Sequence, residues 1–425
     1  MNTVKALLEK NREISAWRVS QTLRTSYELF FVHRSLETVR ATDTADISVT
    51  VYVDHDGARG DSSFSVSPAM SESDIAEKID AAVSRAKLVS NPPYTLPERD
   101  TLHAELPTNM KDADMKALGC RIAEAVFQAD TVPGGSINAC EIFLYRDTLR
   151  VLNSSGVDKT QVTHRVMIEA IPTFTDDHQS VELYEDYRFT VFDPEKITAE
   201  IADKMAAVRD RVSAQKPRTP MTVNVLLRPH EIEELLLEYA WALNYSAVYS
   251  HANPIKLGDD LQKDGDGDRI SFTMKGIVAG SDRSALFDDD GLALTDTCLI
   301  QNGVVKNYFG SNRFGQYLNV EKPSGSLKCI SLGAGSFSKQ QLKAQPYLEC
   351  ASLSGLQVDL YNDYVGGEIR LAYYFDGEAL RPVTGITMSG KLSDVMRHLR
   401  LSRETAVQGS YEGPSLLLMQ GITVL

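Results

Sequence analysis

The chain has 425 residues, with 44 Lys and Arg against 58 Asp and Glu, which gives a net charge of −14. A hydrophobic fraction of 43% and a charged fraction of 24% are typical of a globular protein with a sizeable buried core. The excess of negative charge repels phosphate backbones, so we expect no direct contact with nucleic acid. No apolar run is long enough to cross a bilayer, and the amphipathic N-terminus lacks the features of a signal segment. The composition therefore predicts a cytoplasmic protein with no membrane partner.

The N-terminal half is predicted to combine strands with amphipathic helices. Residues 27–32 and 47–53 have the aromatic and β-branched content of strands. A capping box at Ser71 opens a helix in which apolar residues recur on one face. Two further helices are expected, one around residues 115–126 and one that Asp193 caps. We therefore expect an N-terminal domain of strands covered by long helices.

The polar segment 214–220 contains two prolines and is predicted to be a linker between two domains. It separates an N-terminal α+β domain, residues 1–213, from a C-terminal domain, residues 221–425. The C-terminal domain opens with a strand at 222–227, and one central helix follows from about Pro229. Short strands and Gly, Asp and Asn turns dominate the rest, which is typical of a β-rich domain with a barrel-like or curved sheet. The predicted fold class is α+β.

His230 and Glu231, at the start of the central helix, match the first half of the HExxH motif of zinc proteases. That motif has a second His one helical turn later, so that both imidazoles reach one metal ion. Glu234 occupies that position here. Glu231, Glu233 and Glu234 instead suit the positive end of a helix dipole. We therefore predict a helix start at this place and no metal site.

Two acidic loops are further candidates for a cation site. Asp264–Asp268 resembles a calcium loop, but Arg269 and Lys275 stand where the helix–loop–helix motif needs a Gly and a Glu. Asp288–Asp290 precedes Gly291, and this composition is also that of an ordinary tight turn. The sequence favours polar turns at both places.

No sequence motif identifies a catalytic nucleophile or a cofactor-binding site. The sequence has no GxSxG elbow, no GxxxxGK[ST] loop and no GxGxxG between a strand and a helix. The five cysteines are far apart and show no CxxC spacing, so neither a disulfide framework nor a zinc knuckle is indicated. We expect them to be small buried apolar residues in a reducing compartment.

Several segments resemble the TldD/PmbA metalloprotease family, in matching order along the chain. The strand, turn and helix from Val51 and the turn at residues 153–156 resemble features of that family's first half. In the second half, Phe287–Gly291 resembles its FDDEG turn and Val358–Leu371 its closing sheet. Residues 413–424 resemble its C-terminal strand pair. Members of this family have been linked to modulation of DNA gyrase and to peptide maturation.

The resemblance implies a peptidase built from two kinds of subunit. The TldD-like subunit holds zinc with an HExxxH helix and a C-terminal cysteine, and the PmbA-like (TldE) subunit lacks these ligands. Counted from Leu227, the motif should lie at residues 237–242, where Glu238 stands at the position of the catalytic Glu. Leu237 and Ala242 replace the two His ligands, and no cysteine follows Cys350. The resemblance therefore implies no confident catalytic residue, no metal and no cofactor in this chain.

The leading hypothesis is a non-catalytic, TldE-like subunit that pairs with a TldD-like zinc peptidase acting on flexible polypeptides. A second hypothesis is a homodimeric peptide-binding or structural protein without a protease partner. For both, the expected ligand is a peptide or an unfolded polypeptide. A third hypothesis is a hydrolase with unconventional metal ligands, for which His251, Asp259 and Asp260 are the candidates because they lie just beyond the central helix.

Overall fold

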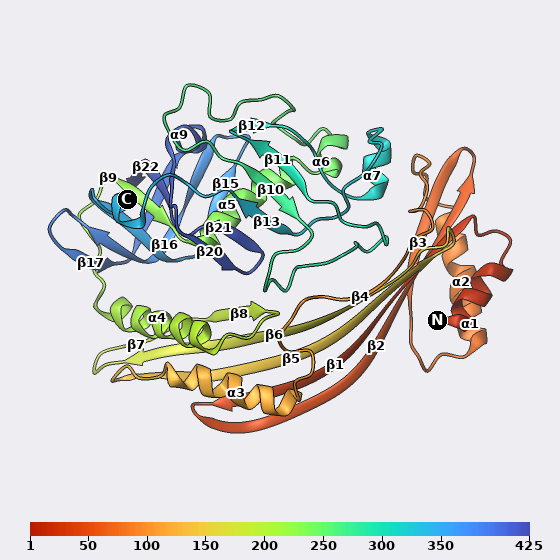
Figure 1. Cartoon of the computed structure of the whole chain (residues 1–425), viewed down its shortest axis with the longest axis horizontal. Helices are drawn as coiled ribbons and strands as arrows, with labels where there is room; N and C mark the ends of the chain where they lie inside the picture. Colours follow the sequence, from red (N-terminus) through yellow and green to blue (C-terminus); the bar gives the residue numbers. More distant parts are fainter.

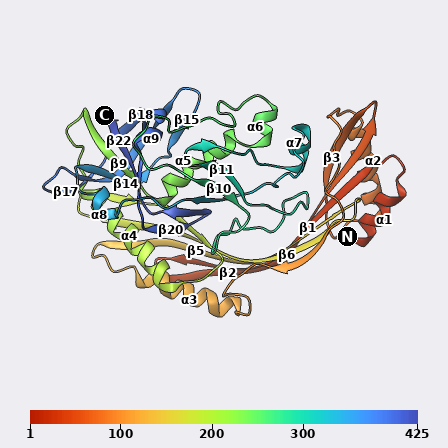
Figure 2. The same ribbon diagram turned by 45° about the horizontal axis from the view of Figure 1, so that its top comes forward.

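The computed structural model describes all residues from Met1 to Leu425 and shows mixed α and β structure, which confirms the predicted α+β class. The N-terminal half forms one long, curled and largely antiparallel sheet, and the C-terminal half lies above it (Figure 1). A view turned by 45° shows this sheet curving beneath the C-terminal half toward the helices at its far end (Figure 2). No helix is both long enough and apolar enough to cross a membrane.

The N-terminal sheet has the strand order β3-β2-β1-β5-β6-β4, and β7 and β8 also pair with β6. Its central strands are much longer than average strands, and along β6 buried and half-buried residues alternate as expected when one face meets a core. This length gives the sheet a surface that reaches the C-terminal half at several separate places. The strands are β1 Ala16–Val32, β2 Ser35–His55, β3 Ala58–Val66, β4 Thr101–Glu105, β5 Gly135–Asn153, β6 Asp158–Thr175, β7 Ser180–Glu182 and β8 Glu185–Phe189.

Helices cover the two ends of this sheet, as the sequence predicts. The side chain of Ser71 accepts from the N–H of Asp74, whose carboxylate accepts from the N–H of Ser71, so the capping box is present. Asp193 caps the last helix of this half. α3 and α4 pack together at one end around Ile122 and Ile201, whereas α1 and α2 cover the other end (Figure 1). The helices are α1 Asn2–Lys10, α2 Glu72–Ala86, α3 Met115–Gln128 and α4 Pro194–Ser213.

Five strands of the C-terminal half close into a barrel. Their order is β14-β9-β22-β18-β16, and pairing between β14 and β16 closes the ring. Closure removes the sheet edges and encloses a core that includes the fully buried Val225, Leu348 and Ile369. Of the barrel and the curved sheet that the sequence left open, the structure shows the barrel. The strands are β9 Met221–Leu227, β14 Tyr347–Leu353, β16 Tyr364–Phe375, β18 Ile386–Lys391 and β22 Leu417–Val424.

A second sheet, in the order β12-β11-β10-β13-β21-β20, shares one apolar core with the barrel and α5. Its strands are β10 Phe272–Lys275, β11 Thr297–Gln301, β12 Val304–Val305, β13 Cys329–Leu332, β20 Thr405–Gln408 and β21 Tyr411–Pro414. Short strands β15 Gln357–Asp359, β17 Leu380–Val383 and β19 Arg400–Leu401 extend the barrel sheet. The expected central helix is α5 Pro229–Ala242, and shorter helices accompany it: α6 Tyr245–Tyr249, α7 Asn312–Tyr317, α8 Lys339–Leu342 and α9 Leu392–His398.

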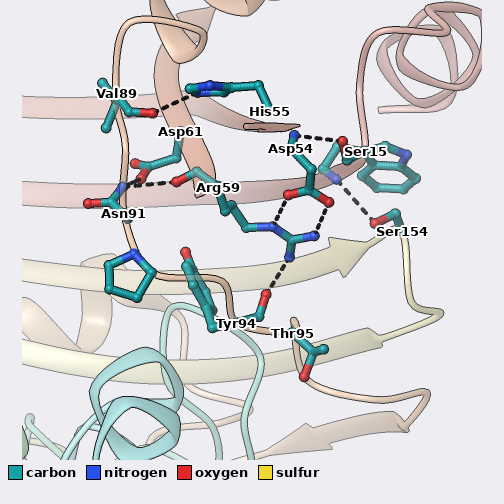
Figure 3. Close-up of polar contacts among 12 residues, drawn as sticks. Ser15, Asp54, His55, Arg59, Asp61, Val89, Asn91, Tyr94, Thr95 and Ser154 are labelled. Carbon is teal, nitrogen blue, oxygen red and sulfur yellow. Dashed lines mark hydrogen bonds and ion pairs between the residues drawn. The ribbon is translucent and has the colours of Figure 1, made fainter. Parts of the chain in front are cut away.

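Helix α7 joins the C-terminal half to the N-terminal half near β3 (Figure 1). The side-chain amide of Gln316 donates to the carbonyl oxygen of Thr95 and accepts from its N–H, both at 2.9 Å. The segment that carries Thr95 is itself fixed, because the Arg59 guanidinium donates to the carboxylate of Asp54 and to the carbonyl oxygen of Tyr94 (Figure 3). These contacts hold the two halves together at this end of the sheet.

Candidate functional site

Helix α5 lies inside the C-terminal half and leaves one side uncovered. Pro229 occupies its first turn, where the missing N–H costs no hydrogen bond, and Glu231 suits the positive end of the helix dipole. Because α5 begins at Pro229, the helix start predicted at His230 and Glu231 is confirmed. The apolar side is at most 2% exposed and consists of Ile232, Leu235, Leu236 and Tyr239.

The three residues expected at the family's zinc motif lie on different sides of α5. Leu237 is 43% exposed, Glu238 is exposed, and Ala242 is fully buried. Side chains five residues apart on a helix are rotated by about 140°, which explains the contrast between Leu237 and Ala242. Leucine and alanine have no atom that binds a metal, so the residues present here do not fit a catalytic zinc ion. The structure contains no group of three or more His, Cys, Asp or Glu side chains that could hold a metal ion.

Three adjoining cavities follow the uncovered side of α5, and we name them together the α5 groove. The first, second and third cavities have volumes of about 580, 340 and 620 Å³. His230 lines all three. The first and second also share Tyr187 and Glu200, and the second and third share Glu233 and Gly409. The groove therefore runs from the interface between the two halves, past the start of α5, to the C-terminal end of that helix.

The third cavity has an apolar floor. Trp241 is 52% exposed and Leu237 is 43% exposed, although large apolar side chains are more often buried. The charged side chains of Arg188, Asp282 and Arg283 also line this cavity. Apolar surface bordered by polar groups is typical of a binding groove. The rest of the floor consists of Ala240, Met274, Phe309 and Leu327.

Two acidic side chains of α5 lie in the wall of the groove, Glu231 buried and Glu233 half-buried. Glu231 is 6% exposed, burial raises the pKa of its carboxyl, and its Oε2 has no hydrogen-bond partner. Burial also raises the pKa of Glu233, whose carboxylate accepts a hydrogen bond from the hydroxyl of Ser410. A buried carboxylate without a compensating cation is costly. The groove thus has an acidic wall at the start of α5.

The positive charges near the start of α5 are already paired. Arg228 contacts the carboxylates of Glu349 and Asp203, each at 3.1 Å. Burial acts to raise the pKa of Glu349. The positive charges of Arg228 and Lys343 overcome this effect and hold the pKa below its usual value. Lys204 of α4 contacts Glu185 at 2.7 Å. The two cations near Glu231, Arg228 and Lys204, are therefore already paired with other carboxylates.

The loop at Asp264–Asp268 is a polar turn, as predicted. The carboxylate of Asp266 contacts His398 Nδ1 at 2.6 Å and an Arg400 nitrogen at 2.9 Å. Asp268 accepts hydrogen bonds from the Ser336 hydroxyl and the Leu401 N–H, both at 2.7 Å. Because the carboxylates of Asp266 and Asp268 are used by these neighbours, the loop is tied to the end of α9, to β19 and to the segment that carries Ser336.

The turn at Asp288–Asp290 also has a structural role. Burial, helped by the nearby charge of Asp290, raises the pKa of Asp288 to about 6. Asp290 forms an ion pair with Arg18 of β1, so the turn docks on the N-terminal sheet. The carboxylate of Asp288 accepts from three backbone N–H groups, those of Asp290, Leu292 and Ser326.

His251, Asp259 and Asp260 do not assemble into a ligand set. Asp260 forms an ion pair with Arg269 at 2.9 Å. Asp259 accepts a hydrogen bond from the N–H of Lys256 at 2.8 Å. His251 is exposed, and these three residues form no group that could hold a metal ion.

Sequence reasoning missed the wall of the groove that faces α5. Tyr187 of β8, Glu200 of α4 and Gln408 of β20 come from three separate segments, and the fold brings them beside His230. No motif spacing links these segments. The only local signal is that Glu200 directly precedes the buried Ile201, which places a carboxylate at the border of the apolar face of α4.

Residues 220–425 of the chain match the PmbA/TldA metallopeptidase C-terminal domain. An uncharacterised protein of Methanocaldococcus jannaschii is 23% identical over 279 residues, which are 63% of this chain. The chain spans 65% of the length of that relative.

Solved structures share the fold over the whole chain. TldE of Thermococcus kodakarensis has a TM-score of 0.80 at 14% identity, with 99% of each chain covered. A proposed modulator of DNA gyrase from Bacteroides thetaiotaomicron has a TM-score of 0.81 at 16% identity, covering 100% of this chain and 97% of that one. A similar protein from Thermotoga maritima has a TM-score of 0.75 at 16% identity, covering 100% and 99%. At these identities the likeness shows a common fold.

Proposed function

Because this chain belongs to the TldD/PmbA family, we propose that it is the non-catalytic, TldE-like subunit of a zinc-dependent peptidase acting on flexible polypeptides. The observation that carries the proposal is the composition of α5, which has Leu237 and Ala242 where the family's zinc ligands are expected. The fold shared with TldE of Thermococcus kodakarensis supports pairing with a TldD-like catalytic subunit.

In this role the chain contributes a surface for the polypeptide rather than the chemistry of cleavage. The α5 groove is long and open, and its third cavity presents the exposed side chains of Leu237 and Trp241. Unfolded polypeptides expose apolar side chains that such a floor binds, and their backbone N–H groups can donate hydrogen bonds to the acidic groups of the wall. The groove therefore supports a role in holding an extended substrate.

Co-expression with a TldD-like subunit that carries an intact HExxxH helix tests the proposal. We expect the two chains to co-purify, and we expect the pair to cleave an unfolded protein such as casein faster than the catalytic subunit alone. This chain alone should show no cleavage. A matched control replaces the first His of the partner's motif by Ala, which should abolish cleavage but leave the complex intact.

Two results contradict the proposal. The first is that this chain forms a stable homodimer, does not bind the catalytic subunit and does not change the activity of that subunit. This result supports the homodimeric peptide-binding alternative. The other is cleavage by this chain alone that a chelator removes, which points to unconventional metal ligands.

A further inference from the structure

Strand β2 lies at one side of the N-terminal sheet and is paired on only one side along part of its length (Figure 1). It pairs with β1 along almost its whole length, but its pairing with β3 begins only at Ile47. Residues 35–46 therefore have a free outer side, and no other strand pairs with them there. A bulge at Glu37 interrupts the pairing with β1 near the hairpin. Residues 38–46 form the regular part of this free side, about 30 Å long, and we name them the β2 edge.

The β2 edge presents backbone groups that have no partner. In an antiparallel pair, every second residue directs its N–H and C=O toward the neighbouring strand, and the residues between direct theirs away from it. Because β1 takes only the inward groups, about half of the N–H and C=O groups of the edge point outward. The edge contains no proline and no lysine, two residues that often protect free edges from pairing. An extended strand is the partner that matches such an alternating row.

One face of the β2 edge is apolar and uncovered. Val39, Ala41 and Ala45 lie on the same face of β2 as Ile47, because side chains alternate along a strand. Helix α2 covers this face from Ile47 onward in a shared apolar core, and α3 covers β1 and β5. The β2 edge lies beyond both helices: Val39 is 44% exposed, and Leu23, opposite Ala45 on β1, is 43% exposed. A docking strand would therefore extend the apolar cover of this face.

The uncompensated charges along the β2 edge are negative. Asp43 and Asp46 are exposed and form no ion pair. Arg40 is the one cation, and it forms an ion pair with the buried Glu28 of β1, so its charge is compensated within the sheet. Glu37 adds a further exposed acid at the adjoining bulge. Two such edges repel each other, as do two chains of net charge −14, so the charges favour a strand with basic side chains over a second copy of this chain.

We propose that a β-strand of the TldD-like subunit docks on the β2 edge, in edge-to-edge pairing that continues the N-terminal sheet into the other subunit. The inference rests on the proposed function in one respect, namely that this chain pairs with such a subunit. The docking strand carries apolar side chains on the face of Val39 and basic side chains toward Asp43 and Asp46. Backbone hydrogen bonds give this contact its strength, and the side chains give it its selectivity.

Hydrogen–deuterium exchange of this chain, alone and in complex with the TldD-like subunit, tests the docking. In the chain alone, the outward amides of residues 38–46 should exchange fast because they face water. In the complex, about half of the amides of this segment should become protected, because the outward N–H groups gain acceptors. The amides that already pair with β1 should change little, and they serve as an internal reference.

Asp43→Lys and Asp46→Lys test the charge of the docking strand. Each places a positive charge beside the basic side chains expected on that strand, so each should raise the dissociation constant of the complex at least about 10-fold. Both positions are exposed, and we expect the variants to fold. Glu77→Lys makes the same charge change at an exposed position of α2, away from the edge, and should leave the affinity unchanged.

A complex that forms without new protection in residues 38–46 overturns the inference and leaves the proposed subunit role standing. Unchanged affinity of both the Asp43→Lys and Asp46→Lys variants also overturns it. Protection of residues 38–46 that rises with concentration in this chain alone overturns it as well, because it identifies a second copy as the occupant. Failure of any complex to form contradicts both proposals. Protection at the edge, in a complex that cleaves casein no faster than the catalytic subunit alone, removes only the peptidase role.

Discussion

Replacing Asp288 by Asn should change how the stability of the protein depends on pH. In the folded chain burial raises the pKa of this carboxyl from 3.8 to about 6. The folded state therefore keeps the proton longer than the unfolded state, and stability falls as pH rises from about 4 to about 6. The pKa difference corresponds to a loss of about 3 kcal/mol, complete above the folded pKa. The amide introduced by Asp288→Asn cannot titrate, so the variant should lack this contribution.

Urea unfolding of the two proteins at about pH 4 and at about pH 7 measures the effect. Asn at this position alters the hydrogen bond with Ser326, but that cost is the same at both pH values and cancels in the comparison. Relative to the native chain, the variant should gain about 2.4 kcal/mol between the two pH values, because at pH 4 part of the unfolded chain is already ionised at this position. Asp289→Asn makes the same charge change at the exposed neighbour and serves as the control. Parallel pH profiles for the native chain and the Asp288→Asn variant would refute the reasoning.

Four further substitutions test the placement of individual side chains. Ala242→His should destabilise the protein by about 1–3 kcal/mol because Ala242 is fully buried. Leu237→His, on the exposed side of α5, should cost less than about 0.5 kcal/mol. Equal losses of stability in urea unfolding would contradict the described orientation of α5. Gln316→Ala removes three hydrogen bonds with Thr95, so hydrogen exchange around Thr95 should become faster. Unchanged exchange would show that Gln316 does not hold this segment. Phe272→Ala should cost about 3–5 kcal/mol in urea unfolding because Phe272 is fully buried in the largest core; a loss below about 1 kcal/mol would contradict that packing.

Elements that depend on neighbouring residues were predictable from the sequence. The capping box at Ser71 and the cap at Asp193 act within four residues, and both open helices in the structure. The start of α5 at Pro229 was predictable for the same reason. The acidic turn at Asp288 also follows local rules, because its carboxylate mainly serves nearby N–H groups.

Features that depend on distant segments were not predictable in detail. The barrel closes through pairing of β14 with β16. The sequence of a short strand does not reveal which other strand it pairs with. β4 forms in the Pro-rich segment 91–109 because it pairs in parallel with β6, and no local pattern indicates that pairing. The α5 groove combines residues such as Tyr187 and Glu231 from separate segments. The domain division at residues 214–220 stays a prediction, which limited proteolysis would test.

Native mass spectrometry of this chain co-expressed with a TldD-like subunit tests the central claim most directly. The account predicts a heterodimer that contains one zinc ion for each catalytic subunit, and it predicts that this chain, purified alone, carries no stoichiometric zinc. The reason is that Leu237 and Ala242 provide no ligand atoms. A stoichiometric zinc ion on this chain alone, or the absence of any heterodimer, would contradict the account.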